Sequence, residues 1–318
     1  MTDTNPVLSV AERLQYRASL YAAIRTFFSE RKVTEVETPI FSAYANTDPF
    51  IQSLPAHFPG QLKYAHTSPE FAMKRLLCQG SGDIYQICKV FRLEEEGRLH
   101  QQEFSMLEWY RLGVGYRQLA GEVLELLNTL GLGGRTEHYT YQQLFRKFLN
   151  IDVLDTDVSN LRQTARSCGI NDIDLGEDFD GWLHLLLTHV IEPQIKNIPL
   201  LAIYDFPASQ AALAKLSEND RRVALRFEIY VKGIELANGY QELTESVVYR
   251  QRFEKENDWR KRHQMALMPI DEALLQDLES GLPECAGVAL GLDRLLMLHQ
   301  NCDSLQQVLV NSDVKERL

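Results

Sequence analysis

The chain has 318 residues, of which 45% are hydrophobic and 24% are charged, and its formal net charge is −11. This length and composition are enough to bury a core, which excludes a disordered chain. The acidic balance disfavours a nucleic-acid partner such as tRNA, because phosphate binding draws on clustered Lys and Arg. The basic run Arg260-Lys261-Arg262 is an exception, and a short run of this kind is usually a solvated helix face.

The sequence contains no apolar run of the roughly 18 to 20 residues that a membrane-spanning helix needs. Its five cysteines lack the CxxC spacing of a zinc site, and their odd number does not indicate a disulfide framework. We therefore expect reduced thiols, a cytoplasmic location and no membrane partner.

The first predicted element is a long helix, because Ser9 and Glu12 have the spacing of a capping box. The β-prone run from Val33 to Val36 follows and stops at Pro39, which has no amide proton for a sheet. Ser68-Pro69-Glu70 then has the pattern of an N-cap, a first-turn proline and a first-turn carboxylate, and predicts another helix.

Two strands are predicted next, from Ile84 to Arg92 and from about Glu103 to Arg111, as an antiparallel hairpin with a long loop. Residues 113–199 have a helical pattern, with Thr140 and Gln143 as a second capping pair. Strand patterns resume at 200–205 and 227–236, and the chain ends with a helix, a glycine-rich strand and a helix. We expect one α+β domain over 1–318, an antiparallel sheet flanked by helices, with a helical insertion at about 113–199.

Three groups of residues have the composition of a binding site. On the second hairpin strand, alternation places Phe104, Met106, Glu108 and Tyr110 on one face, and Arg92 on the first strand offers a planar fork for a carboxylate or phosphate. Structural ion pairs and core aromatics explain this set about as well. Each of the two other groups, considered alone, also allows both a structural and a functional interpretation.

The second group is Gly287 to Arg294, where small residues let a ligand approach the backbone, although they are also common where a helix packs closely on a sheet. The third is Glu235 to Glu242, in which two carboxylates lie on either side of Asn238-Gly239. Paired carboxylates can bind Mg²⁺, and Asn-Gly is also the sequence of a simple hairpin turn.

The order of these groups resembles the three motifs of class II aminoacyl-tRNA synthetases. Val33 to Pro39 is similar to the first motif, Phe91-Arg92-Leu93-Glu94 with His100 and Phe104 to the second, and Gly291 to Arg294 to the third. Thr67-Ser68-Pro69-Glu70, Met106 to Tyr110 and Glu235 to Gly239 resemble the lysyl subgroup. The resemblance is strongest to stand-alone lysyl paralogues that attach β-lysine to a lysine of elongation factor P.

The resemblance implies an AMP-forming, ATP-dependent ligase whose catalytic residues are Arg92, Glu235 and Arg294. Arg92 would bind the substrate carboxylate and the α-phosphate, Arg294 would brace the γ-phosphate, and Glu235 would help to hold Mg²⁺. The full ATP set would comprise Arg92, Glu94, His100, Gln101, Phe104, Glu235, Leu236, Gly291 and Arg294. The substrate set would comprise Ser68, Pro69, Glu70, Tyr110, Asn238, Glu242 and Ala289. Glu235 and Glu242 are the candidate metal ligands.

Two features separate the sequence from ordinary lysyl synthetases. The first helix begins near residue 9, so we expect no anticodon-binding domain and no tRNA partner. Ala289 stands where those enzymes usually have glycine, and one added methyl in a close-fitting pocket is worth about 1 to 3 kcal/mol of discrimination. Ala289 therefore favours a substrate with a displaced amine, such as β-lysine. Gln241 and Gln101 depart from the histidine and asparagine of the paralogues.

The resemblance also implies a homodimer, because first-motif segments form the dimer interface in this class. Two alternatives remain open from the sequence. One is a truncated lysyl enzyme that charges tRNA with lysine, and the other is a catalytically silent paralogue that binds an amino acid and regulates a partner.

Overall fold

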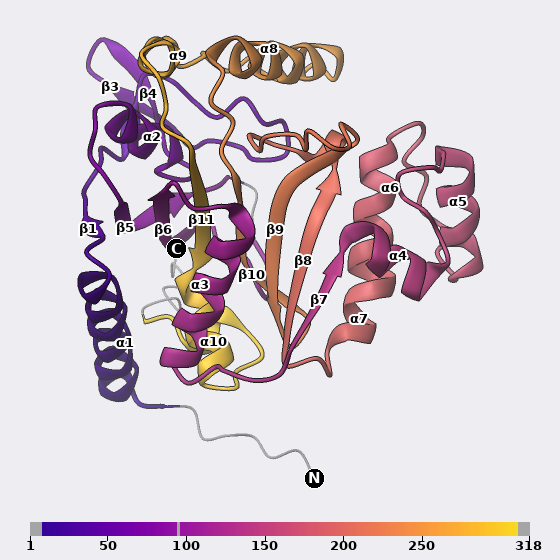
Figure 1. Ribbon diagram of the computed structural model, residues 1–318, viewed down its shortest axis with the longest axis horizontal. Helices are drawn as coiled ribbons and strands as arrows, with labels where there is room; N and C mark the ends of the chain where they lie inside the picture. The colour runs from indigo at the N-terminus through magenta and orange to yellow at the C-terminus, as the bar shows by residue number, and fades with distance from the viewer. Residues whose placement is uncertain (1–7, 94–95, 311–318) are drawn as a thin grey trace, which may run out of the picture. The chain divides into compact units, whose positions relative to one another are not determined.

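The computed structural model describes residues 8–93 and 96–310, and the chain divides into two compact units (Figure 1). The first unit comprises Met1–Val114, Leu130–Leu132 and Leu243–Leu318, and the second comprises Gly115–Thr129 and Gly133–Glu242. Each unit combines mainly antiparallel strands with helices, as the predicted α+β class requires. That residues 1–318 form one domain with a helical insertion stays a prediction.

The strands of the first unit run in the order β1 (Thr34–Glu35), β5 (Ile84–Phe91), β6 (Glu103–Leu112) and β11 (Cys285–Gly291). Strand β1 is parallel to β5, and the other neighbours are antiparallel. The predicted hairpin is thus confirmed as β5 and β6. A small sheet has the order β2 (Phe41–Ser42), β4 (Gln61–Ala65) and β3 (Pro55–Phe58).

Helices of the first unit are α1 (Val10–Glu30), α2 (Glu70–Cys78), α8 (Ser246–Arg262), α9 (Glu272–Glu279) and α10 (Leu292–His299), with a 3₁₀ turn at Leu305–Gln307. The capping box predicted at the start of α1 is present: the Ser9 amide donates to Glu12 and the Glu12 amide to the Ser9 hydroxyl. Phe28 at the end of α1 stacks on Tyr85 of β5 and meets the edge of Trp109 on β6. These buried rings join the first helix to the sheet.

The second unit has the strand order β10 (Ile234–Gln241), β9 (Val223–Val231), β8 (Leu200–Pro207) and β7 (Thr136–Thr140). Its helices are α3 (Tyr116–Thr129), α4 (Tyr141–Leu149), α5 (Val158–Ser167), α6 (Phe179–Leu186) and α7 (Glu192–Ile195), with a π turn at Leu187–Ile191 and a 3₁₀ turn at Ala208–Gln210. The Thr140 and Gln143 capping box is confirmed at the start of α4. Tyr141, Phe145 and Trp182 are fully or almost fully buried in its core.

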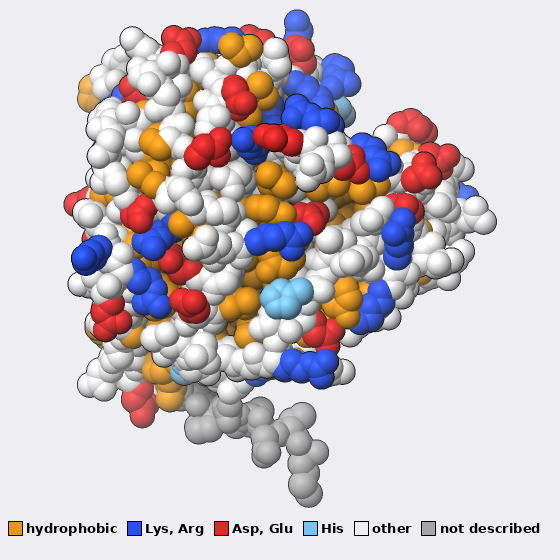
Figure 2. Space-filling view, viewed as in Figure 1, with side chains coloured by type: hydrophobic (Ala, Val, Ile, Leu, Met, Phe, Trp, Pro, Cys, Tyr) orange, Lys and Arg blue, Asp and Glu red, His pale blue; other side chains and the backbone are white. Residues whose placement is uncertain are grey.

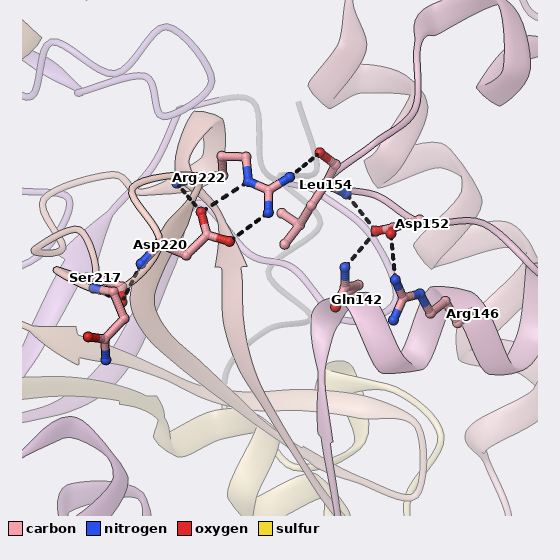
Figure 3. Close-up of polar contacts among 8 residues, drawn as sticks. Gln142, Arg146, Asp152, Leu154, Ser217, Asp220 and Arg222 are labelled. Atoms are coloured by element: carbon pink, nitrogen blue, oxygen red, sulfur yellow. Dashed lines mark hydrogen bonds and ion pairs between the residues drawn. The ribbon is translucent and has the colours of Figure 1, made fainter.

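Polar contacts hold the loop after α4 against the connection between β8 and β9 (Figure 3). Asp152 accepts the side-chain amide of Gln142 at 2.6 Å and the backbone amide of Leu154 at 3.1 Å. Arg222 donates to the Leu154 carbonyl at 3.2 Å and to both carboxylate oxygens of Asp220. This loop is therefore fixed on both sides by charged side chains.

Four local predictions differ from the structure. Helix α2 begins at Glu70 with Pro69 as its N-cap, because the Ser68 hydroxyl bonds the Glu70 amide two residues on. The 113–199 segment is not helical throughout, since β7 pairs with β8 there. The predicted strand at 227–236 is two strands, separated at Lys232-Gly233 where both residues have positive φ. Asn238-Gly239 lies inside β10, so the hairpin-turn interpretation is wrong.

Arg260 is fully buried, which overturns the expectation that its basic run is a solvated face. Its guanidinium donates to the carbonyls of Thr47 at 2.8 Å and Asp48 at 2.7 Å, whereas Lys261 and Arg262 are exposed. Figure 2 shows the Lys and Arg side chains that gather near the end of α8. Among the residues described, no helix has the length and apolar character to cross a membrane.

Candidate active site

One face of strand β6 carries the four side chains that alternation predicts there, namely Phe104, Met106, Glu108 and Tyr110. Tyr110 is opposite Gly287 of β11, Glu108 is opposite Ala289, and Met106 is opposite Gly291. Residues directly opposite in an antiparallel pair share a face, with their Cβ atoms about 5 Å apart. Gly287 therefore places no side chain beside Tyr110, and Ala289 places a single methyl beside Glu108.

Glu108 lies at the centre of this face, and in the sequence it belongs to the Met106 to Tyr110 segment but is not among the predicted site residues. Its carboxylate accepts the Ser68 hydroxyl at 2.6 Å and the Tyr110 hydroxyl at 2.7 Å, and its residue is 2% exposed. Burial, followed by the negative charge of Glu70, raises the pKa of Glu108 to about 7. A buried carboxylate of this kind favours a cationic ligand, which would offset its desolvation.

Glu70 is held at the start of α2, where the helix dipole favours a negative charge. The Ser68 hydroxyl that donates to Glu108 also accepts the Glu70 amide at 3.0 Å. Ser68, Pro69 and Glu70 line a pocket of about 350 Å³, whose other wall is the segment from Pro39 to Asn46. The structure thus brings the predicted residues Ser68, Glu70 and Tyr110 together around one buried carboxylate.

Arg92 lies just after β5 and its guanidinium carbon is 5.1 Å from the ring centre of Phe104 on β6. Its Nε donates to the Thr67 carbonyl at 3.3 Å, so the arginine contacts the segment that also carries Ser68 and Glu70. An arginine over an aromatic ring can bind a phosphate or carboxylate beside a flat base. Glu94, the other residue predicted for this position, lies outside the described residues.

Arg294 and His100 are also brought together. Arg294 is on the first turn of α10, its Nη2 is 2.8 Å from His100 Nε2, and its Nε donates to the Leu99 carbonyl at 3.2 Å. Gly291 precedes this helix as its N-cap, and Gln101 follows His100 as a half-buried residue before β6. The guanidinium is therefore fixed from the loop that joins β5 to β6.

The remaining predicted residues belong to the second unit, on β10 and its end. The β9–β10 ladder pairs Glu235 with Tyr230, shifts register before Ala237, and then pairs Asn238 with Glu228 and Tyr240 with Arg226. Because of this bulge, Glu235 and Asn238 share a face although they are an odd number of residues apart. Leu236 and Glu242 are both buried.

A buried ionic network surrounds Asn238 on this face. The Asn238 side-chain oxygen accepts Arg226 Nε at 3.2 Å, and Arg226 Nη2 also donates to Glu228 at 2.6 Å. Tyr230 donates to the other Glu228 oxygen at 2.8 Å. Burial, followed by the charge of Glu235, raises the pKa of Glu228 to about 7. Glu228 cannot be selected from the sequence, because its position on the shared face depends on the strand pairing.

The predicted residues therefore form two groups, one in each unit. The first group contains Ser68, Pro69, Glu70, Arg92, His100, Gln101, Phe104, Tyr110, Ala289, Gly291 and Arg294. The second contains Glu235, Leu236, Asn238 and Glu242. In the first unit Arg92 and Arg294 accompany Glu70 and the buried Glu108, and in the second Arg226 and the buried Glu228 accompany Glu235 and Asn238. Such a composition suits charged substrates.

Comparison with known families decides what kind of protein carries these groups. Residues 7–313 match the family model described as tRNA synthetases class II (D, K and N). The chain belongs to this family. Membership confirms the resemblance seen in the three motifs and the predicted α+β class II fold, and it implies that the chain uses ATP.

Relatives of this class II synthetase chain match it over almost its full length. It is 47% identical to the elongation factor P--(R)-beta-lysine ligase of Pectobacterium carotovorum subsp. carotovorum (strain PC1), over 98% of each chain. It is also 47% identical to the ligase of the same name from Vibrio parahaemolyticus, over 96% of this chain and 97% of the relative. The ligase of Edwardsiella ictaluri is 44% identical over 98% of each chain.

Proposed function

We propose that the chain activates (R)-β-lysine with ATP and transfers it to a lysine of elongation factor P. Near-full-length relatives that bear the name of this ligase support the proposal. The observation that carries it on this chain's own residues is the position of Ala289 opposite Glu108. The Ala289 methyl adds bulk beside the Glu108 carboxylate, which disfavours the arrangement of α-lysine. A substrate whose amine is displaced along its carbon skeleton, such as β-lysine, fits better.

In the first step, a substrate carboxylate oxygen attacks the α-phosphorus of ATP, an adenylate forms and pyrophosphate leaves. Arg92 would hold the attacking carboxylate and the α-phosphate, while Phe104 and Glu94 would hold the adenine and Arg294 the γ-phosphate. Fixed cations at these points stabilise the negative charge that develops during phosphoryl transfer. In the second step, the ε-amine of the acceptor lysine attacks the adenylate carbonyl carbon and AMP leaves.

Negatively charged side chains would hold the two ammonium groups of the substrate. Glu70 would bind the amine near the carboxylate. Tyr110 in the first unit and Glu242 in the second are the residues that the resemblance assigns to the distal ammonium. Glu108 adds a buried negative charge between Ser68 and Tyr110. Such an arrangement offsets the desolvation of a buried ammonium.

Mg²⁺ fits the carboxylates of the second unit. Among the described residues no cluster of three or more His, Cys, Asp or Glu could hold a metal, so a magnesium ion would use one or two carboxylates together with ATP oxygens. Glu235 would be one ligand. The sequence pairs it with Glu242. Glu228 is a less suitable ligand, because both of its oxygens accept hydrogen bonds from Arg226 and Tyr230. Bound Mg²⁺ would neutralise polyphosphate charge.

The proposed reaction has a direct test. Purified chain, ATP, Mg²⁺, (R)-β-lysine and unmodified elongation factor P should yield a factor heavier by one β-lysyl group in intact-mass spectrometry. The Arg294→Ala variant is the control for ATP-dependent transfer. An unmodified factor, together with charging of tRNA by α-lysine, would overturn the proposal in favour of a truncated lysyl synthetase.

We also propose a cytoplasmic homodimer, since the acceptor is a translation factor and α1 with β1 corresponds to the first motif of the class. Sedimentation at several protein concentrations should give twice the monomer mass. A single monomeric species across the range would contradict the dimer.

A further inference from the structure

Lys74 is a fully buried cation one helical turn after Glu70 on α2. Its ammonium donates to a Glu70 carboxylate oxygen at 2.6 Å and to the Tyr249 hydroxyl at 2.9 Å. Tyr249 is also fully buried, and its ring centre is 5.3 Å from the Lys74 nitrogen. Burying an ammonium is costly, so these contacts must be well ordered to be retained.

The contact with the Lys74 ammonium also restricts the Glu70 carboxylate. Glu70 has a 19% exposed side chain and lines the pocket, whereas Lys74 is enclosed beneath it. One carboxylate oxygen is held from the buried side by a charged hydrogen bond, which restricts the rotation of the Glu70 side chain. The Lys74 charge also reaches Glu108, whose pKa it lowers against the effect of burial.

We propose that Lys74 and Tyr249 are positioning residues that fix the Glu70 carboxylate for the substrate amine. The inference rests on the proposed function of Glu70. It gives α8 a role in amino-acid binding, although Tyr249 belongs to none of the motifs. The alternative is that the contact only joins α2 to α8 and has no effect on substrate binding. The two roles predict different values of KM for the amino acid.

The test measures amino-acid-dependent exchange of pyrophosphate into ATP. Lys74→Met should raise KM for β-lysine at least about tenfold, since a hydrogen bond to a charged group is worth roughly 1.5 to 3 kcal/mol. Tyr249→Phe removes only the hydroxyl and should raise the same KM by a smaller factor. KM for ATP should stay within about twofold of wild type in both variants. Tyr141→Phe is the matched control, because Tyr141 is also fully buried but belongs to the second unit.

A double-mutant cycle separates positioning from a structural role. If Lys74 acts through Glu70, Lys74→Met should add nothing to KM for β-lysine in a Glu70→Gln background. Additive effects, or equal rises in both KM values with a lowered melting temperature, would overturn the inference. If wild type exchanges only with α-lysine, the substrate of the proposed function is wrong. The same cycle run on α-lysine then tests the positioning role independently.

Discussion

Asp293 accepts the backbone amide of Ser105 through Oδ2 at 2.7 Å. Ser105 follows Phe104 on β6, and Asp293 precedes Arg294 on α10, so this bond joins the strand proposed for adenine to the helix proposed for phosphate. The other oxygen of Asp293 accepts Arg17 of α1 at 2.6 Å. A single buried carboxylate thus connects segments from all three sequence motifs or their neighbours.

Removing that carboxylate should affect both folding and ATP binding. Asp293→Ala removes the carboxylate that accepts the Ser105 amide and Arg17 Nη2, and we expect the free energy of unfolding to fall by about 3 kcal/mol. Asp293→Asn retains an oxygen that can accept the Ser105 backbone amide, so the free energy of unfolding should fall by less. In that milder variant KM for ATP should rise because Arg294 is less well fixed. Urea denaturation and exchange kinetics measure the two effects, and an unchanged KM for ATP in Asp293→Asn would contradict the link to Arg294.

Arg294→Ala should reduce pyrophosphate exchange by a factor of about 100 to 1,000, because it removes a fixed cation that stabilises developing phosphate charge. Arg262→Ala, which changes an exposed arginine at the end of α8, should leave the rate unchanged. Unaltered ATP turnover in Arg294→Ala would show that the phosphate assignment is wrong.

Arg260→Met should lower the free energy of unfolding by about 3 kcal/mol. The substitution leaves the carbonyls of the buried Thr47 and the half-buried Asp48 without their charged donor, which costs more than the loss of a surface contact. Arg262→Met, two residues further along, is the control and should stay within about 0.5 kcal/mol of wild type. Equal urea midpoints for the two variants would contradict the structural role of Arg260.

Glu108 should make stability depend on pH in a defined direction. Its pKa is raised by burial to about 7 from an ordinary value of 4.5, so the folded state binds the proton more tightly than the unfolded state. The stabilisation that comes from binding this proton is present in full below pH 4.5, and it is lost as pH rises through 7. Relative to Glu108→Gln, wild type should lose about 3 kcal/mol of unfolding free energy between pH 5 and 8. Urea titrations at both pH values measure the difference.

Substrate binding should show the opposite trend. The carboxylate of Glu108 is charged above pH 7 and attracts an ammonium, so KM for β-lysine in wild type should fall as pH rises from 6 to 8. In Glu108→Gln this fall should be much smaller. Identical pH profiles for the two proteins would show that Glu108 does not titrate in the binding pocket.

The sequence by itself determined the features that depend on near neighbours in the chain. The capping boxes at Ser9 and Thr140, the hairpin of β5 and β6, and the three ordered motifs are all local patterns. A side chain three residues away can cap a helix whatever the rest of the fold does. The same locality explains why Ser68, Glu70 and Tyr110 could be selected from their motifs.

Tertiary structure decided which side chains meet. The bulge in β10 places Glu235 and Asn238 on one face, which strict alternation would have put on opposite faces. Glu108, Glu228, Lys74 and Tyr249 also have near neighbours as partners, but their burial and their contacts with Ser68, Asn238 and one another depend on how distant segments pack. Arg260 has the same chemistry as Arg262, yet one is buried and the other exposed. Local sequence fixes a residue's chemistry, whereas strand register and helix packing determine the partner and the dielectric that govern its charge.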